Sequence, residues 1–177
     1  MTTDEELVVL LDDNGAPIGT HPKATVHTTD TPLHLAFSCF LLDADGRVLL
    51  TRRALVKRAW PGVWTNAFCG HPGPGEDFPS AIARRASDEL GTTITGLREA
   101  LPDFRYRAVD ASGIVENEMC PVYLAELSAP LYPEPAEVME TAWIHPDDLD
   151  AALGSAPFAF SPWLRQEWAA LRADGHV

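Results

Sequence analysis

Residues 70–91 read GHPGPGEDFPSAIARRASDELG, a loop of glycine and proline followed by one amphipathic helix. Apolar residues recur three or four positions apart at Ile82, Ala86 and Leu90, which is the period of a helix that buries one face. Gly91 follows directly, and glycine is common just after the last residue of a helix. The pattern therefore predicts a helix over residues 79–90.

Strand patterns dominate the rest of the chain. Residues 7–11 and a short strand ending near residues 19–21 predict a first hairpin across the turn between them. Residues 35–42 and 47–53 predict a second, more apolar hairpin. Further strands are expected near residues 104–107, 116–127 and 137–144, and further helices near residues 146–153 and 162–172.

This order of elements predicts an α+β fold, a mixed β sandwich with flanking helices. At 177 residues the chain has room for one well-buried domain and is short for two. It contains neither an internal repeat nor a linker-like segment. We expect a single domain over residues 1–177.

The chain is strongly acidic, with 26 Asp and Glu against 13 Lys and Arg and a formal net charge of -13. No basic stripe is present to displace the counterions of a nucleic acid, so nucleic acid is not expected as a partner. No run approaches the ~18 apolar residues of a membrane span, and the N-terminus lacks the basic start of a secretory signal. The three cysteines are widely spaced, which favours free thiols in a reducing compartment. We expect a cytoplasmic protein with no membrane partner.

Several residue types that carry chemistry stand close together. Cys69 and His71 flank one glycine, and Glu116 and Glu118 stand two positions apart on a predicted strand. Side chains two apart on a strand point to the same side, so the two carboxylates should lie together. A thiol, an imidazole and two carboxylates are the parts of a metal-assisted acid/base site. The alternative for the glutamate pair is a solvated strand face, where water compensates both charges.

The 70–91 segment resembles the Nudix box, in which Gly70, Glu76, Arg84 and Glu89 match the family pattern. Two positions depart from it, since Arg85 and Asp88 stand where the family has glutamates. Nudix hydrolases use these glutamates to hold several divalent cations that activate water against a diphosphate. Because Arg85 inverts the charge at one of them, the resemblance implies a Nudix-like fold that has lost the hydrolytic cluster but could hold one Mg²⁺ through Glu89.

From about residue 7 to residue 163 the chain resembles one branch of that superfamily, the type I isopentenyl-diphosphate isomerases. The resemblance rests on segments 27–37, 51–55, 59–66, 69–72, 102–108, 113–118 and 160–163. It implies reversible isomerisation of isopentenyl diphosphate to dimethylallyl diphosphate. The expected partner is this small-molecule substrate, and the protein is expected to be a monomer. Moving an alkene by one carbon requires protonation at one carbon and loss of a proton from another, so two acid/base groups on opposite faces of a dry pocket are needed.

The resemblance also implies roles for individual residues. Acid/base residues are Cys69 and Glu118, assisted by Tyr106, while Trp163 stabilises the developing cation through its π face. One divalent ion, Mn²⁺, Mg²⁺ or Zn²⁺, is bound by His27, His34, His71, Glu116 and Glu118. A second ion, Mg²⁺, is shared between Glu89 and the substrate diphosphate. The diphosphate end of the pocket is lined by Lys23, Arg52, Lys57 and Arg85.

Two other functions remain open at this point. A Nudix diphosphate hydrolase would retain its box glutamates, and Arg85 argues against it. A non-catalytic metal-binding module would tolerate loss of Cys69 and Tyr106, and both are present.

Overall fold

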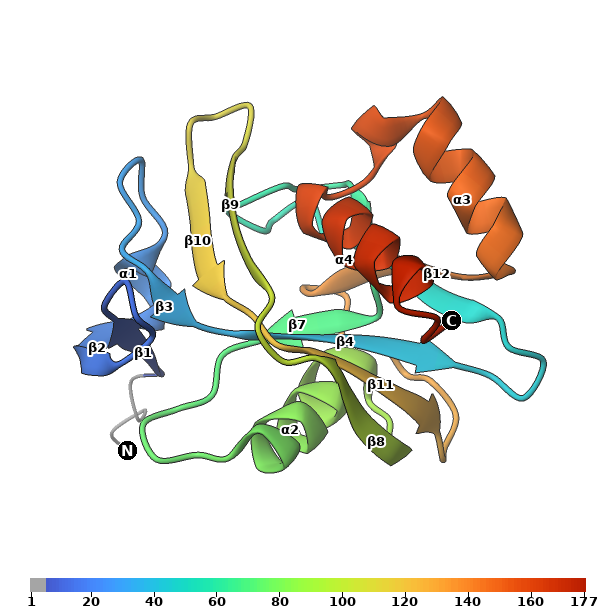
Figure 1. The fold of residues 1–177 in the computed structure, drawn as a ribbon, viewed down its shortest axis with the longest axis horizontal. Coiled ribbons are helices and arrows are strands. Elements are labelled where there is room, and N and C mark those ends of the chain that lie inside the picture. Colours follow the sequence, from blue (N-terminus) through green and yellow to red (C-terminus); the bar gives the residue numbers. More distant parts are fainter. Residues whose placement is uncertain (1–5) are drawn as a thin grey trace.

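The computed structural model describes residues 6–177. Their strands form two sheets, and the chain runs directly from a strand of one sheet into a strand of the other (Figure 1). The five-stranded sheet has the order β2-β1-β3-β10-β9. Its strands are β1 Leu7–Leu11, β2 Pro17–Pro22, β3 His34–Leu35, β9 Arg105–Val109 and β10 Val115–Met119.

The second sheet has seven strands in the order β12-β5-β4-β11-β8, with β6 paired to β5 and β7 to β4. Its strands are β4 Phe37–Leu42, β5 Val48–Arg53, β6 Trp64–Thr65, β7 Phe68–Gly70, β8 Ile94–Leu101, β11 Val122–Leu127 and β12 Val138–Ile144. The helices are α1 Lys23–Val26, α2 Phe78–Leu90, α3 Pro146–Ser155, the 3-10 turn η1 Pro157–Ala159 and α4 Pro162–Ala173.

Helices cover both faces of the seven-stranded sheet, with α2 on one side and α3 and α4 on the other (Figure 1). Strand β4 supplies both cores because successive side chains alternate. Phe37 and Leu41 pack with α2, while Phe40 packs with Leu164 and Trp168 of α4. The expected α+β class is therefore confirmed.

The predicted central helix is confirmed within one residue of its start. Asp77 caps α2 by accepting a hydrogen bond from the Ser80 backbone N–H at 2.7 Å. Gly91 ends it with φ of 57°, and a side chain there would clash with the Tyr132 carbonyl oxygen. Only glycine fits this position, because both the backbone angle and the space exclude a Cβ.

The strand predicted over residues 116–127 is wrong as a single element. It divides into β10 and β11, which belong to different sheets. Pro121 has no N–H to donate, and the Cys120 N–H donates to the Phe104 carbonyl at 2.9 Å. The adjacent segment crosses from one sheet to the other in the same way, because β3 ends before Ala36 and β4 begins after it. The carboxylates of β10 therefore belong to a different sheet from the apolar strand β11 that follows them.

The second predicted hairpin is confirmed at its turn but opens beyond it. Strands β4 and β5 pair only at Leu42 and Val48. The segment β6–β7 enters the gap, pairing with β5 at one side and β4 at the other. Buried Asn66 holds it there by donating to the carbonyls of Cys39 at 3.1 Å and Phe68 at 2.9 Å. This insertion places Cys69 beside the junction of the two sheets.

Strands β6, β7 and β8 and the short helix α1 lie outside the elements predicted from sequence. Strand β8 is an edge strand whose charged side chains mask the apolar alternation. None of the helices within residues 6–177 is long and apolar enough to cross a membrane.

Candidate active site

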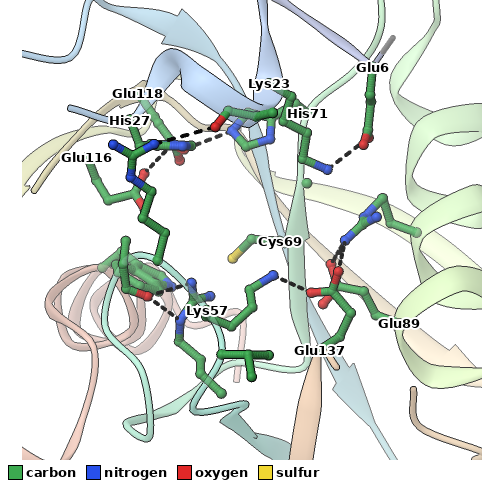
Figure 2. A pocket seen from close by; sticks show the side chains of 18 of the residues that line it. Glu6, Lys23, His27, Lys57, Cys69, His71, Glu89, Glu116, Glu118 and Glu137 are labelled. Carbon is green, nitrogen blue, oxygen red and sulfur yellow. Dashed lines mark hydrogen bonds and ion pairs between the residues drawn. The ribbon is translucent and has the colours of Figure 1, made fainter. Parts of the chain in front are cut away.

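A cavity of about 470 Å³ opens where the two sheets meet (Figure 2). It is lined by side chains from both sheets and from α1, α2 and α4. Of the residues predicted from sequence, those that line it are Lys23, His27, Lys57, Cys69, His71, Arg85, Glu89, Tyr106, Glu116, Glu118 and Trp163. His34 lies fully buried directly behind this wall. The structure thus brings together segments separated by more than a hundred residues.

Glu118 is held between two neighbours by strand register. On one side it pairs with His34 of β3, and on the other with Tyr106 of β9. Directly opposed residues on adjacent strands project to the same face, so all three side chains meet. The Tyr106 hydroxyl donates to Glu118 Oε2 at 2.9 Å, while Glu118 Oε1 faces the imidazoles.

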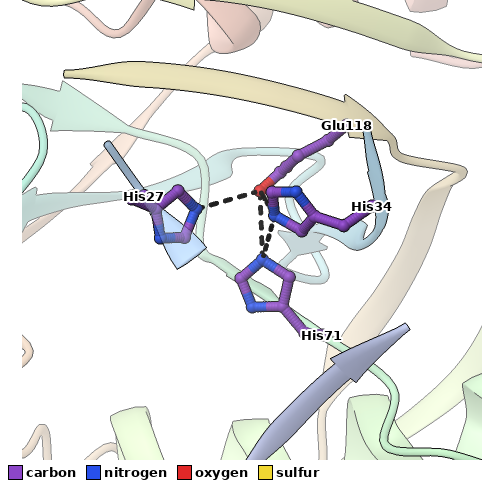
Figure 3. A group of neighbouring side chains, drawn as sticks. All are labelled: His27, His34, His71 and Glu118. Carbon is purple, nitrogen blue, oxygen red and sulfur yellow. Dashed lines mark hydrogen bonds and ion pairs between the residues drawn. The ribbon is translucent and has the colours of Figure 1, made fainter. Parts of the chain in front are cut away.

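The histidine cluster comprises His27, His34, His71 and Glu118, whose ligand atoms all lie within 4.8 Å of one another (Figure 3). The Nε2 atoms of His71, His34 and His27 lie 3.1, 3.4 and 3.9 Å from Glu118 Oε1. Glu116 lies outside this tight group but contacts it, since its Oε2 is 2.9 Å from His27 Nε2. Three nitrogens converge on one carboxylate oxygen from three separate segments of chain.

The donor set of the histidine cluster fits a divalent cation. His34 Nδ1 lies 2.9 Å from the Pro32 carbonyl oxygen, which can only accept, so Nδ1 carries the hydrogen and Nε2 presents a lone pair. That lone pair faces His71 Nε2 at 3.2 Å. A lone pair in this position can bind a cation, and imidazole with carboxylate suits several divalent metals.

The protonation of the cluster agrees with this fit. Burial lowers the pKa of His71 to about 4 despite its contact with Glu118, so its imidazole is neutral and able to bind a metal. Burial also opposes charge on His27, but Glu116 and Glu118 raise its pKa to about 9. Burial would raise the pKa of Glu118, yet its contacts with His27, His34 and His71 hold it well below its usual range. A proton on His27 supplies the positive charge that a bound cation would bring.

Cys69 projects into the cavity from β7 (Figure 2). Its register partner on β4 is Ser38, whose Oγ lies 3.2 Å from Cys69 Sγ. Asn66 Nδ2 lies 3.4 Å from the same sulfur. Burial raises the pKa of the Cys69 thiol. Cys69 therefore holds its proton, and the three cysteines are free, as expected.

Trp163 forms an aromatic wall at the start of α4. Its Nε1 donates to Asn66 Oδ1 at 3.1 Å, which fixes the ring. The ring centroid lies 5.7 Å from that of Tyr106 and 5.4 Å from that of Trp60. The Arg53 guanidinium carbon lies 5.4 Å from the Trp163 centroid. An indole π face attracts positive charge, which is the property that a developing cation needs.

At the other end of the cavity, three cations are each paired with a carboxylate. Lys23 Nζ lies 2.8 Å from Glu6 Oε1, Lys57 pairs with Glu137, and Arg85 pairs with Glu89. Burial would lower the pKa of Arg85, but the charge of Glu89 and its neighbours raises it. We call these three pairs the cationic end. An anion that binds here competes with carboxylates for the same cations.

Gly70 brings α2 close to the cavity. A Cβ at Gly70 would lie 2.7 Å from Arg85 Cγ and 2.8 Å from Phe37 Cζ. The absent side chain lets Arg85 and Glu89, one helical turn apart, face the residues of β7.

Arg52 is a correction, because it does not line the cavity. Its guanidinium contacts Glu140 at 3.0 Å and its Nε donates to the Gly62 carbonyl at 2.9 Å. Adjacent strand residues point to opposite sides, and here Arg53 takes the cavity side of β5. Arg53 was missed for that reason, and Arg58 is a further cation of the lining that the sequence did not indicate.

The chain matches the NUDIX domain over residues 32–164. It is 63% identical over 159 residues to an isopentenyl-diphosphate Delta-isomerase of Paenarthrobacter aurescens, covering 90% of this chain and 86% of the relative. It is 60% identical over 164 residues to a protein of the same name from Clavibacter sepedonicus, covering 93% and 86%. A MutT NUDIX hydrolase from Burkholderia pseudomallei superposes with a TM-score of 0.60 at 23% identity, covering 78% of this chain and 98% of that one.

The chain belongs to the isopentenyl-diphosphate Delta-isomerase branch of the NUDIX family. The solved hydrolase supports the NUDIX fold alone.

Within the NUDIX fold, the box residues of this chain separate into two groups. Arg84 clamps Glu76 through two hydrogen bonds of 2.9 and 2.8 Å, and Glu76 also accepts from the Gly73 N–H at 2.8 Å. This clamp fixes the loop before α2. Exposed Asp88 does not line the cavity, and among the box acids only Glu89 does.

Glu167 is a fully buried acid that the sequence analysis missed. It lies on α4 between the core residues Leu164 and Leu171, and its Oε2 accepts a hydrogen bond from Ser38 at 2.9 Å. A glutamate on the apolar stripe of an amphipathic helix was the signal available.

Replacing Glu167 with glutamine should stabilise the fold increasingly as pH rises. Burial, opposed by the Ser38 hydrogen bond and reinforced by the charge of Glu118, raises the pKa of Glu167 from 4.5 to about 8. Between these values the folded protein holds a proton that the unfolded chain has released, so wild-type stability falls by about 1.4 kcal/mol per pH unit. Glutamine has no such proton. Denaturant unfolding should show the two proteins diverging from pH 4.5 to pH 8, whereas a gap independent of pH would contradict the buried neutral acid.

Proposed function

We propose that this chain interconverts isopentenyl diphosphate and dimethylallyl diphosphate by protonating and deprotonating the alkene. The observation that carries the proposal is that the Cys69 thiol and the Glu118 carboxylate line the same cavity from different sheets. Their surroundings favour a protonated thiol and an ionised carboxylate. Relatives that are 60% and 63% identical over most of the chain carry the name of this isomerase.

The two groups suit the proton movements of the reaction. The C3=C4 π pair takes a proton at C4, which leaves a tertiary cation at C3, and loss of a proton from C2 forms the new double bond. One of Cys69 and Glu118 donates and the other accepts, and the roles are exchanged in the reverse direction. The Tyr106 hydroxyl, which donates to Glu118, holds that carboxylate in position.

Trp163 is placed to stabilise the cation. Its ring lines the same cavity and is only 2% exposed. A desolvated cation–π contact contributes about 2 kcal/mol.

The cationic end is proposed to bind the diphosphate. Lys23, Lys57 and Arg85 supply charge-assisted contacts, with Arg53 and Arg58 close by. Because each of the first three already has a carboxylate partner, Mg²⁺ held by Glu89 would offset the competing negative charge. The diphosphate remains whole and serves as a handle that positions the alkene. Arg52 would act only from outside the cavity.

The histidine cluster is proposed to hold one divalent ion through His27, His34, His71 and Glu118, with Glu116 as a fifth ligand beside His27. When bound, the ion supplies positive charge that stabilises the carboxylate form of Glu118. Imidazole and oxygen ligands admit Mn²⁺, Mg²⁺ or Zn²⁺.

We propose a monomer in which residues 1–177 act as a single domain. The free cysteines support a reducing, cytoplasmic location.

A diphosphate hydrolase is less well supported. Hydrolysis needs several box carboxylates around the metals, yet Glu76 is clamped by Arg84 and Asp88 lies outside the cavity. One experiment separates the two functions. Purified protein with Mg²⁺ is incubated with isopentenyl diphosphate and, separately, with nucleoside diphosphate derivatives. Formation of dimethylallyl diphosphate without phosphate release supports the isomerase, and phosphate release from nucleotides without isomer overturns it.

Removal of divalent ions should abolish isomerisation, and adding one back should restore it, because the three imidazoles and Glu118 then regain a shared cation. Ion affinity should also fall as pH drops, since the imidazoles take up protons. Elemental analysis alongside the activity assay checks this. Full activity in protein shown to be free of metal would mean that the cluster has no part in the reaction.

A further inference from the structure

Trp60 is held in a backbone conformation that tryptophan rarely adopts. Within residues 6–177 it is the single residue other than glycine with a positive φ, at 46°. A bulky side chain makes this left-handed conformation unfavourable, so the surrounding contacts must stabilise it. Strain of this kind is common at functional sites, where neighbouring contacts keep a side chain in one place. Trp60 does not line the cavity, and the roles assigned above leave it unused.

Arg53 holds the backbone of this strained turn, which lies in the loop between β5 and β6. Its Nε donates to the carbonyl oxygens of Ala59 and Trp60, both at 3.2 Å, and its Nη2 donates to the Ala59 carbonyl at 2.9 Å. The Gly62 N–H in turn donates to the Arg53 carbonyl at 3.0 Å. These contacts with the loop are made to backbone atoms, so they can remain when the Trp60 ring is replaced.

A second contact ties Trp60 to the hairpin of β9 and β10. The Trp60 backbone N–H donates to Asp110 Oδ2 at 3.4 Å. Asp110 lies at the turn of this hairpin, where its Oδ1 accepts from the backbone N–H groups of Ser112 and Ile114 at 2.8 and 3.0 Å. The same hairpin carries Glu118. Trp60 is thus connected to the wall of the cavity that supplies the proposed acid/base carboxylate.

These two backbone contacts place the Trp60 ring against Trp163. The two ring centroids lie 5.4 Å apart with the planes at 88°, which is an edge-to-face arrangement. At a different point on Trp163, its Nε1 donates to Asn66 Oδ1 at 3.1 Å. A single hydrogen bond leaves a planar ring free to tilt, whereas a second ring packed against it restricts the tilt. Trp60 and Asn66 together fix the direction of the Trp163 π face.

We propose that Trp60 is a positioning residue for the isomerisation, which holds the Trp163 π face toward the carbon that becomes cationic. The proposal rests on the isomerase function proposed above, in which Trp163 stabilises that cation. The attraction depends on the cation lying over the face of the ring, so a tilted ring stabilises it less. Because the cation exists only along the reaction path, a misplaced ring should slow the reaction without weakening substrate binding.

Removal of the Trp60 ring should separate the rate from substrate binding. Trp60→Ala should lower kcat for isopentenyl diphosphate about 5–30-fold, which corresponds to losing most of a cation–π contact. KM should stay within about threefold, because the ring is not part of the cationic end. Trp60→Phe keeps an aromatic ring against Trp163, so its kcat should remain within about threefold of the wild type.

Trp60→Gly distinguishes positioning from stability. Glycine adopts a φ of 46° without steric cost, so Trp60→Gly should melt at a higher temperature than Trp60→Ala. Neither variant has a ring to pack against Trp163, so the two should share the same low kcat. If the rate merely followed the stability of the fold, the glycine variant would be the faster one.

Asp110→Asn provides a second, independent variant. Asp110 Oδ1 accepts from three donors, so it should keep its place, and the new amide group then stands where the acceptor of the Trp60 N–H was. An amide N–H cannot accept this hydrogen bond, and kcat should fall about 2–10-fold. The double variant with Trp60→Ala should be no slower than Trp60→Ala alone, because both changes release the same ring.

Trp143→Ala is the matched control. Trp143 is a half-buried tryptophan of β12 that packs on the α2 side of the sheet and does not line the cavity. Its replacement should lower the melting temperature, as loss of a large core side chain does, and should leave kcat and KM at their wild-type values.

The outcomes separate this proposal from the function on which it rests. Slow Trp60→Ala and Trp60→Gly proteins with unchanged KM, together with recovery in Trp60→Phe, support the positioning role. Wild-type kcat in Trp60→Ala, a rise in KM alone, or a Trp60→Gly rate that recovers with stability overturns it and leaves the isomerase function standing. If no Trp60 variant folds, Asp110→Asn decides, and wild-type kcat in it overturns the role. A wild type that makes no isomer overturns the proposed function and this inference together.

Discussion

Cys69→Ala should slow isomerisation by a factor on the order of 10²–10⁴ or more, because it removes one of the two groups that exchange protons with the alkene. Its metal content should equal that of the wild type, since the sulfur is not part of the histidine cluster. Steady-state kinetics and elemental analysis on the same preparation measure both quantities. The predicted combination is a folded, metal-loaded and inactive protein.

Cys39→Ala is the matched control for this variant. Cys39 is a fully buried thiol of the core that packs on the α2 side of the sheet. Its loss should cost some stability by leaving a small cavity, yet the rate should stay within a few-fold of the wild type. A Cys69→Ala protein that turns over at nearly the wild-type rate would remove the sulfur from the mechanism.

Glu118→Gln should abolish isomerisation to a comparable extent, on the order of 10²–10⁴ or more, and should weaken metal binding as well. Its Oε1 lies 3.1 and 3.4 Å from two imidazole nitrogens, and its Oε2 accepts from Tyr106. An amide is uncharged, so it is a weaker ligand and a far weaker base. Isothermal titration with the divalent ion and the isomerisation assay report the two losses separately.

Glu126→Gln serves as the control for charge removal, because Glu126 is exposed at the far end of β11. It should keep both activity and metal affinity. If Glu118→Gln keeps wild-type metal affinity, the histidine cluster does not use this carboxylate, and if it keeps the rate, another base must act.

Local periodicity was sufficient to predict the parts of the site that lie within one element. The two-residue period of a strand placed Glu116 and Glu118 on the same side, and both line the cavity. The helical period and Gly91 placed α2 to within one residue. These features depend on neighbours in the sequence, which is why they could be predicted from it.

Features set by contacts between distant segments could not be predicted in this way. The choice between Arg52 and Arg53 depends on which side of β5 faces the cavity, and that is decided by its pairing with β6 and β12. The entry of β6–β7 into the opened hairpin depends on Asn66, whose partners lie on β4. The periodicity of a single strand predicts neither which strands pair with β5 nor which residues Asn66 contacts.

The fate of solvent hydrogen tests the central claim most directly. The purified protein is incubated with isopentenyl diphosphate and Mg²⁺ in D₂O, and the product is examined by NMR. The protonating group exchanges with solvent, so dimethylallyl diphosphate should carry deuterium in its newly formed methyl group, with the diphosphate intact. Release of phosphate would contradict the account. So would recovery of only unlabelled isopentenyl diphosphate, with no dimethylallyl diphosphate, from protein that is folded and metal-loaded.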